Sequence, residues 1–220
     1  MDTIPANYKR KIDNLNEKDL LPLVCSAAAL RKADYLRLFL LKAKSLNINK
    51  YELYESLLQN YLFTGYPSAI VSLKMLKEYF PGNDEKLSED WDLNKYRNRG
   101  MQNCKKIYGR KFNKLISNVK EFSPELSDWL VLEGYGKVMG RKELSLKKRE
   151  LNVVSVLAVL KFEDQLYSHI NGAFRTKSSK EEIQKVLRNL KIFDSNEWTK
   201  FGMKVLNHYL KEKGIVWPIP

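Results

Sequence analysis

Residues 148–187 decide the fold and read KRELNVVSVLAVLKFEDQLYSHINGAFRTKSSKEEIQKVL. The apolar residues of this stretch recur at helical spacing. We predict one helix over 146–160 and a second over 163–174. Ser179 and Glu182 have the spacing of a capping box, which predicts the start of a third helix.

The same framework occurs 130 residues earlier. Segment 18–57 aligns with 148–187 without a gap, and 11 of the 40 positions are identical. Asn49 stands at the capping position that Ser179 fills in the later segment. Matching caps and matching apolar spacing indicate matching geometry. We therefore predict two copies of one three-helix unit, packed through their apolar faces.

The rest of the chain also has helical patterns. We expect helices over about 17–30 and 35–44, one opened by Asn49, and one from Pro67 to the breaker pair at 81–82. Ser123 and Pro124 should begin a helix through Trp129, and Ser195 a last helix ending near 213–214.

No segment alternates apolar and polar residues over a useful length, so the predicted fold class is an all-α helical bundle. We divide the chain into a first, degenerate repeat (1–80), a connecting segment with helices (81–122) and a second repeat (123–220). These parts should form one compact unit. Residues 81–89, PGNDEKLSE, should form an exposed connection.

The composition is that of a soluble globular protein, with 44% hydrophobic residues, but the net charge is +13. Such a charge attracts anions, including nucleic acids. The basic residues are interleaved with Asn, Glu and Asp along the chain, which favours a solvated lysine-rich surface. We do not expect nucleic-acid binding, because no aromatic–basic stacking motif is evident.

The cellular location is predicted from what the sequence lacks. Cys25 and Cys104 are two well-separated thiols, which favours a reducing compartment over a disulfide framework. No secretory signal or membrane span is evident, so we expect a cytoplasmic protein without a membrane partner.

Glu150 and His169 are the candidate catalytic residues. At the 130-residue offset they correspond to Leu20 and Phe39, so the framework itself accepts apolar residues at both positions. A histidine with a nearby carboxylate is a common acid–base unit, because imidazole titrates near neutral pH. The structural alternative is a satisfied core histidine beside a glutamate that pairs with a basic neighbour.

Four further residues are candidates for substrate binding. Gln165 precedes His169 by one helical turn and could hydrogen-bond its ring. Arg141, Arg149 and Arg175 could each hold a substrate carboxylate through two hydrogen bonds. Surface or structural roles are the alternative for all four.

Residues 123–187 resemble the carboxymuconolactone decarboxylase family, which is related to alkylhydroperoxidase D-like proteins. The matching elements are the GYGKV turn, the REL helix start, the QLYSHINGA helix and the SSKEEI cap; upstream, 104–109 (CKKIYG) also matches. The resemblance implies an all-α bundle that assembles into homo-oligomers.

The peroxidase branch of that family uses a Glu, a Cys-x-x-Cys pair and a His. On this chain the Glu is Glu150 and the His is His169, but the cysteine positions hold Phe162 and Gln165. Disulfide-cycling peroxidase chemistry requires both thiols. We therefore do not expect it, and Cys25 and Cys104 are predicted to be inert core thiols.

The decarboxylase branch, by resemblance, uses neither a metal nor an organic cofactor. It implies a lyase or isomerase acting on a small anionic, carboxylated metabolite, with His169 as the acid and Glu150 orienting it. The turn after the helix that carries His169 departs from the family pattern at Lys177. The lactone after which the family is named is therefore not predicted as the substrate. The alternative is a non-catalytic oligomeric member that binds a partner or ligand.

Overall fold

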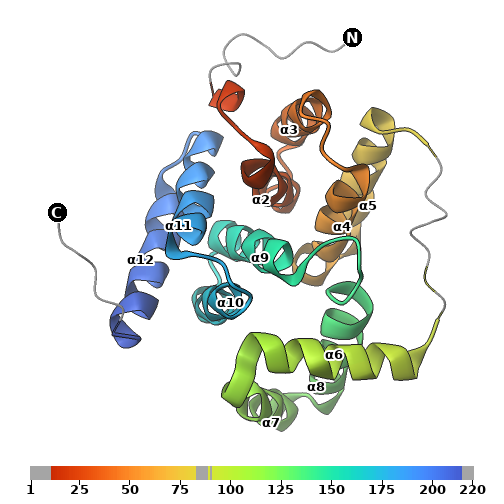
Figure 1. The fold of residues 1–220 in the computed structure, drawn as a ribbon, viewed down its shortest axis with the longest axis vertical. Helices are drawn as coiled ribbons and strands as arrows, with labels where there is room; N and C mark the ends of the chain where they lie inside the picture. The colour runs from red at the N-terminus through yellow and green to blue at the C-terminus, as the bar shows by residue number, and fades with distance from the viewer. Residues whose placement is uncertain (1–10, 83–88, 90, 215–220) are drawn as a thin grey trace.

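The computed structural model describes residues 11–82, 89 and 91–214. No strand occurs among these residues, so the predicted all-α class is confirmed. The chain order is α2 (Glu17–Ala29), α3 (Ala33–Ser45), α4 (Lys50–Gln59), α5 (Tyr61–Tyr79), α6 (Leu93–Tyr108), η2 (Gly109–Lys111), α7 (Phe112–Phe122), α8 (Pro124–Trp129), η3 (Leu130–Val138), α9 (Leu146–Leu160), α10 (Glu163–Arg175), α11 (Lys180–Asn189), η4 (Leu190–Phe193) and α12 (Glu197–Glu212) (Figure 1).

The helix bounds of the two similar segments coincide at the 130-residue offset. α3 and α4 map onto α10 and α11 residue for residue. The left-handed residues that end the helices also correspond, Arg31 to Lys161 and Asn47 to Lys177. A repeated unit would produce these correspondences, and the duplication itself stays a prediction.

α2 and α9 lie side by side near the centre of the molecule (Figure 1). Small buried residues such as Ala28 and Ala158 permit a close approach of neighbouring helices, and Ala158 lies opposite Gly202 on α12. The hydroxyl of Ser155 on α9 donates a hydrogen bond to the carbonyl of Pro22 on α2, at 2.8 Å. The two apolar faces therefore share one core, and the later helices α10, α11 and α12 pack around α9.

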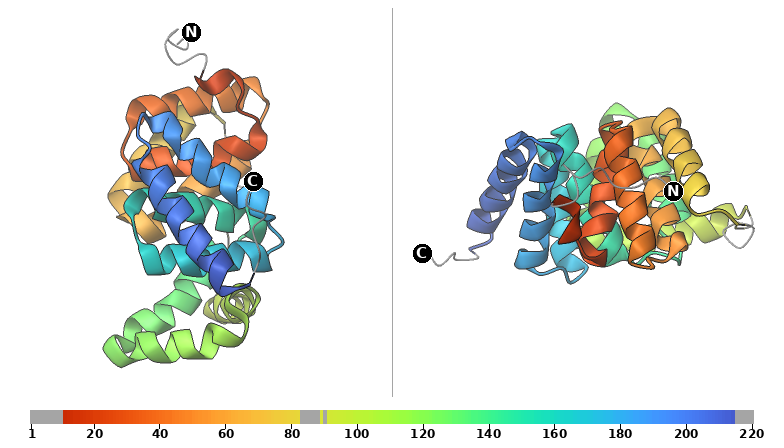
Figure 2. Two further views of the ribbon diagram at one scale, coloured as in Figure 1. Left: turned by 90° about the vertical axis from the view of Figure 1, so that its left-hand side faces the viewer. Right: turned by 90° about the horizontal axis from the view of Figure 1, so that it is seen from above.

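α6 and α7 form a layer at one end of the molecule, drawn in green at the bottom of the left view of Figure 2. α6 packs against η3, which is a π-helix: the N–H of Met139 bonds to the carbonyl of Gly134, five residues earlier, at 2.9 Å. The predicted GYGKV turn is therefore wrong, because residues 134–138 continue a helix that begins at Pro124.

The remaining helix predictions differ in detail. α5 spans Tyr61–Tyr79, but the non-helical Gly65, whose φ is 77°, divides it into two helical parts. The second part begins beside Pro67, as predicted. The capping box of Ser179 and Glu182 is present. The last helix begins at Glu197, whose N–H bonds to Ser195 Oγ at 3.2 Å. The predicted connection over 81–89 lies largely outside the described residues. None of the described helices is both long and apolar enough to cross a membrane.

Candidate active site

Glu150 on α9 and His169 on α10 are in direct contact. His169 Nδ1 lies 2.9 Å from Glu150 Oε2, and the side chains are 8% and 0% exposed. α9 ends at the left-handed residue Lys161, and α10 returns alongside it. The hairpin of α9 and α10 thus brings the two side chains into direct hydrogen-bond contact.

Gly172 makes room for the carboxylate. A Cβ at this position would lie 2.3 Å from Glu150 Oε2 and 2.8 Å from Ile107 Cγ2. Gly172 follows His169 by three residues, so both belong to the same face of α10. α6, α9 and α10 therefore meet at the pair, and only a residue without a side chain fits between them.

Aromatic rings enclose the imidazole. The rings of Phe63 and Tyr108 lie edge-on to His169, with centroid distances of 6.2 and 6.4 Å. The hydroxyl groups of Tyr108 and Tyr135 hydrogen-bond to each other. Burial raises the pKa of Tyr135, and the charges of Tyr108 and Glu150 add to that rise. Both hydroxyls therefore remain protonated near neutral pH, since burial also raises the pKa of Tyr108.

One atom of each catalytic candidate lacks a hydrogen bond to the described residues. Glu150 Oε1 is buried without a partner. His169 Nδ1 is engaged by Glu150, and Nε2 makes no hydrogen bond within the described ranges. A buried polar atom without a partner costs about 1–3 kcal/mol, and of these two atoms the cost falls on Glu150 Oε1.

The surroundings of Arg149 do not fit its predicted role of holding a substrate carboxylate. It is fully buried, and its guanidinium bonds to Glu55 at 2.7 Å, to Gln59 at 3.3 Å and to two backbone carbonyls. Arg141 pairs with the other oxygen of Glu55, also at 2.7 Å. The prediction that these two arginines hold a substrate carboxylate is therefore not supported by the geometry, because both guanidinium groups already bind a buried glutamate.

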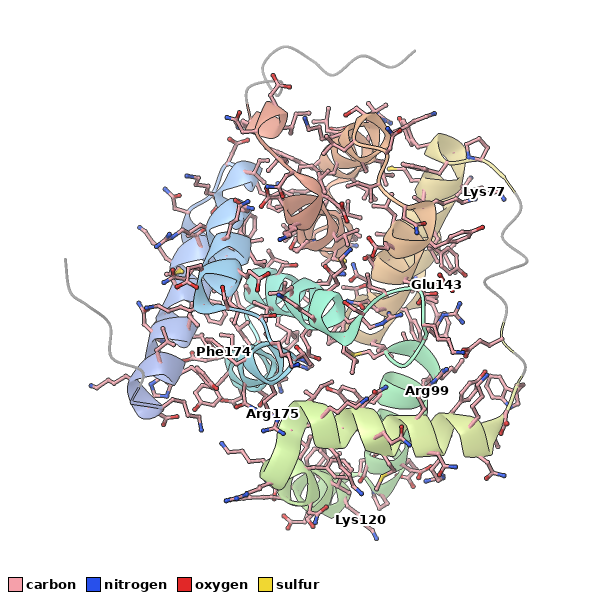
Figure 3. The ribbon with its side chains drawn as sticks, in the orientation of Figure 1. Lys77, Arg99, Lys120, Glu143, Phe174 and Arg175 are labelled. Carbon is pink, nitrogen blue, oxygen red and sulfur yellow. The ribbon has the colours of Figure 1, made fainter. Side chains whose placement is uncertain are left out.

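Gln165 and Arg175 also have other surroundings. Gln165 is exposed on the first turn of α10. The hydrogen bond to the His169 ring that was predicted for Gln165 is made by Glu150 instead. Arg175 Nε donates a hydrogen bond to the carbonyl of Lys106 at 2.8 Å. Its guanidinium lies against Gly109, which follows the last residue of α6. Figure 3 shows Arg175 near one end of α6, so this side chain joins α10 to α6.

An open groove borders the site between α7 and α10. We call it the α7–α10 groove; its volume is about 280 Å³. It is lined by Tyr108, Lys111, Lys114, Leu115, Asn118, Tyr167, Ser168 and Asn171. Tyr108 contacts His169 on one side and the groove on the other, whereas neither Glu150 nor His169 lines the groove itself.

Within the described ranges, no group of three or more His, Cys, Asp or Glu side chains could hold a metal ion. Cys25 and Cys104 are both free and buried. Burial raises the pKa of Cys104 to about 12, and it also raises the pKa of Cys25. The thiols are therefore held as the unreactive protonated form.

Both thiols are expected to resist modification in the folded protein. At pH 8, the rise in the pKa of Cys104 from 9.0 to about 12 leaves roughly a thousandfold less thiolate. Titration with a thiol-reactive disulfide reagent should label two cysteines rapidly in denaturant and almost none without it. Rapid native labelling of Cys104 would contradict its assignment as a core thiol.

Gly172→Ala is expected to displace the Glu150 carboxylate, because the added methyl group cannot share the space with Oε2 and Ile107. The crowding should destabilise the fold by about 1–3 kcal/mol. Imidazole nitrogen NMR should show a changed His169 signal, with the exposed His208 as an internal reference. An unchanged His169 signal would show that the glycine does not position the carboxylate.

No protein-family model matches the chain. The chain is similar to the 4-carboxymuconolactone decarboxylase of Acinetobacter baylyi, with 22% identity over 118 residues. The matched region makes up 53% of this chain and 88% of that protein. This distant similarity supports a relation to the carboxymuconolactone decarboxylase family.

Proposed function

We propose that this protein is a cofactor-independent lyase or isomerase that acts on a small carboxylated metabolite. The observation that carries the proposal is the buried contact between His169 Nδ1 and Glu150 Oε2, with Nε2 left without a partner among the described residues. Glu150 would fix the orientation of the ring, and Nε2 would exchange a proton with the substrate.

For decarboxylation, the bond between the substrate carbon and its carboxylate breaks and carbon dioxide leaves. The electron pair stays on the carbon skeleton, where an adjacent carbonyl can delocalise it. The imidazolium of His169 then delivers the Nε2 proton to that carbon. Solvent reprotonates the ring, so that no cofactor is consumed. An isomerase would use the same nitrogen to remove a proton and return it elsewhere.

The substrate carboxylate requires a cation. Glu55 already occupies Arg141 and Arg149, and Arg175 does not line the α7–α10 groove. Lys111 and Lys114 line the α7–α10 groove together with Tyr108, which contacts the His169 ring. We therefore assign these lysines to the anion. Movement of Tyr108 would open a path from the groove to the imidazole, because its ring both lines the groove and packs edge-on to His169.

One observation favours a second candidate, a non-catalytic protein that binds a ligand or partner. The His169 side chain is only 8% exposed, and neither member of the pair lines the α7–α10 groove. In that case the pair would be a structural contact between α9 and α10. Self-association, expected from the family resemblance, belongs to both candidates.

The test is turnover by the wild-type protein in deuterated water with a panel of small carboxylated lactones and unsaturated acids, beginning with 4-carboxymuconolactone. NMR should show loss of carboxylate and deuterium at the carbon that carried it. Isomerisation without loss of carbon dioxide would place the protein in the isomerase class. Ligand-induced shifts without turnover across the panel would favour the binding protein. A hydroperoxide assay should be negative, since Phe162 and Gln165 occupy the thiol positions.

A further inference from the structure

The positive charge is concentrated in one segment. Residues 95–120 contain nine Lys or Arg and no Asp or Glu, so this segment carries +9 of the net +13. The basic residues of this segment are interleaved with Asn, as expected, but not with the Glu and Asp that were also expected. The segment covers most of α6, the turn η2 and most of α7.

Six of these cations are exposed and form no ion pair with any described residue. They are Lys105, Lys106, Arg110, Lys111, Lys114 and Lys120, and we call them the α6–α7 basic surface. They lie at the end of the molecule where α6 and α7 form the outer layer (Figure 2), and Figure 3 shows Lys120 at its lower edge. By contrast, Arg97 and Arg99 pair with Asp128 and Glu89.

A groove runs along each side of α7. The α7–α10 groove contains Lys111, Lys114 and Asn118. The groove on the other side has a volume of about 500 Å³ and contains Asn113, Ser117 and Lys120. Lysines, amides and a hydroxyl are the side chains that hydrogen-bond phosphate oxygens in nucleic-acid complexes. α7 is about 16 Å long at 1.5 Å per residue, enough to follow about five phosphates of one strand.

The same surface is unsuited to a lipid bilayer. Between residues 102 and 121 no described large hydrophobic side chain is exposed; the exposed ones nearest in sequence are Met101, Phe122 and, on α8, Leu126 and Trp129. A helix that docks on a bilayer buries an apolar face in it, in addition to its charges. Here the exposed positions among the cations are polar, so the chemistry favours a hydrated polyanion.

We propose that the α6–α7 basic surface binds the sugar–phosphate backbone of nucleic acid without reading its sequence. Six phosphate contacts predict a slope of about −4 to −5 in a plot of log affinity against log salt concentration. The proposal does not depend on the proposed enzymatic function. Its test leaves Lys111 and Lys114 unchanged, so that failure of one proposal does not affect the other.

The experiment measures fluorescence anisotropy of a labelled 20-nucleotide strand, and of its duplex, with the full chain over a salt series. The test variant is K105Q/K106Q/R110Q/K120Q. The control variant, K74Q/R188Q/K191Q/K200Q, also removes three lysines and one arginine, all exposed and unpaired among the described residues. Both variants reduce the net charge from +13 to +9, which follows from four neutralised cations.

The test variant should bind at least about tenfold more weakly, and the magnitude of its salt slope should fall by about 3. The control should stay close to wild type in both quantities. Equal losses in both variants would overturn the proposal, because net charge alone would then explain binding. Absence of wild-type binding at low salt would also overturn it, as would binding to phosphatidylserine vesicles but not to nucleic acid. If the test variant is not folded by circular dichroism, R110Q/K120Q replaces it, with R188Q/K200Q as its control.

Discussion

His169→Ala is expected to lower turnover by about 10²- to 10⁴-fold while the protein keeps its helicity and its oligomer size. The magnitude is that of a lost general acid or base. The fold should persist, because the corresponding helix α3 carries the apolar Phe39 at this position and buries it fully. The measurements are kcat on an active substrate from the panel, far-UV circular dichroism and size-exclusion chromatography.

The control for this prediction is E150L/H169F, which places the residues of the first segment, Leu20 and Phe39, at the two candidate positions. Turnover should again be lost. The free energy of unfolding should stay the same or rise by about 1–4 kcal/mol, as when a buried polar pair is replaced by apolar groups of similar volume. A stable variant without activity would separate the site from the scaffold. Retained turnover in either variant would remove His169 from the mechanism.

The helices were predictable because their signals are local. The predicted bounds 146–160 are those of α9, and the capping box at Ser179 begins α11 as expected. Caps and apolar spacing act within a few residues, so they can be read without knowing the partner of a helix. The 130-residue offset then extended the same assignment to α3 and α4.

The surroundings of the candidate pair were less predictable. Comparison of the two segments identified Glu150 and His169 from the sequence, and the structure places them in contact. Arg149 was misjudged because its partner Glu55 lies 94 residues earlier in the chain, beyond any local pattern. Gly172 was visible only as part of the QLYSHINGA match, since its role depends on how closely α10 approaches α9 and α6.

The π-helix could not be inferred from the GYGKV sequence alone. Its geometry depends on α6, whose backbone touches it at two glycines. A Cβ at Gly100 would lie 2.0 Å from the carbonyl oxygen of Val131, and one at Gly136 would lie 2.1 Å from that of Tyr96. Two helices can approach this closely only where the residues at the crossing have no side chain. The sequence contains the glycines, but the crossing itself arises from tertiary packing.

Gly100→Ala is therefore expected to be the most destabilising single methyl addition in this region, by about 3 kcal/mol or more. The new Cβ would meet backbone rather than the flexible end of a side chain, so α6 and the π-helix would have to separate. Urea or thermal unfolding followed by circular dichroism measures the loss.

Gly134→Ala is the matched control, because a Cβ there meets nothing within 4 Å although the residue lies in the same π-helix. It should be neutral or stabilising by up to about 1 kcal/mol, since alanine loses less backbone entropy than glycine on folding.

Separation of α6 from the π-helix would also move Tyr135, whose carbonyl accepts a hydrogen bond from Asn103 and whose hydroxyl bonds to Tyr108. Gly100→Ala should thus disturb the wall of the His169 site as well as the fold. Equal unfolding midpoints for the two variants would show that the close crossing is not what fixes this part of the structure.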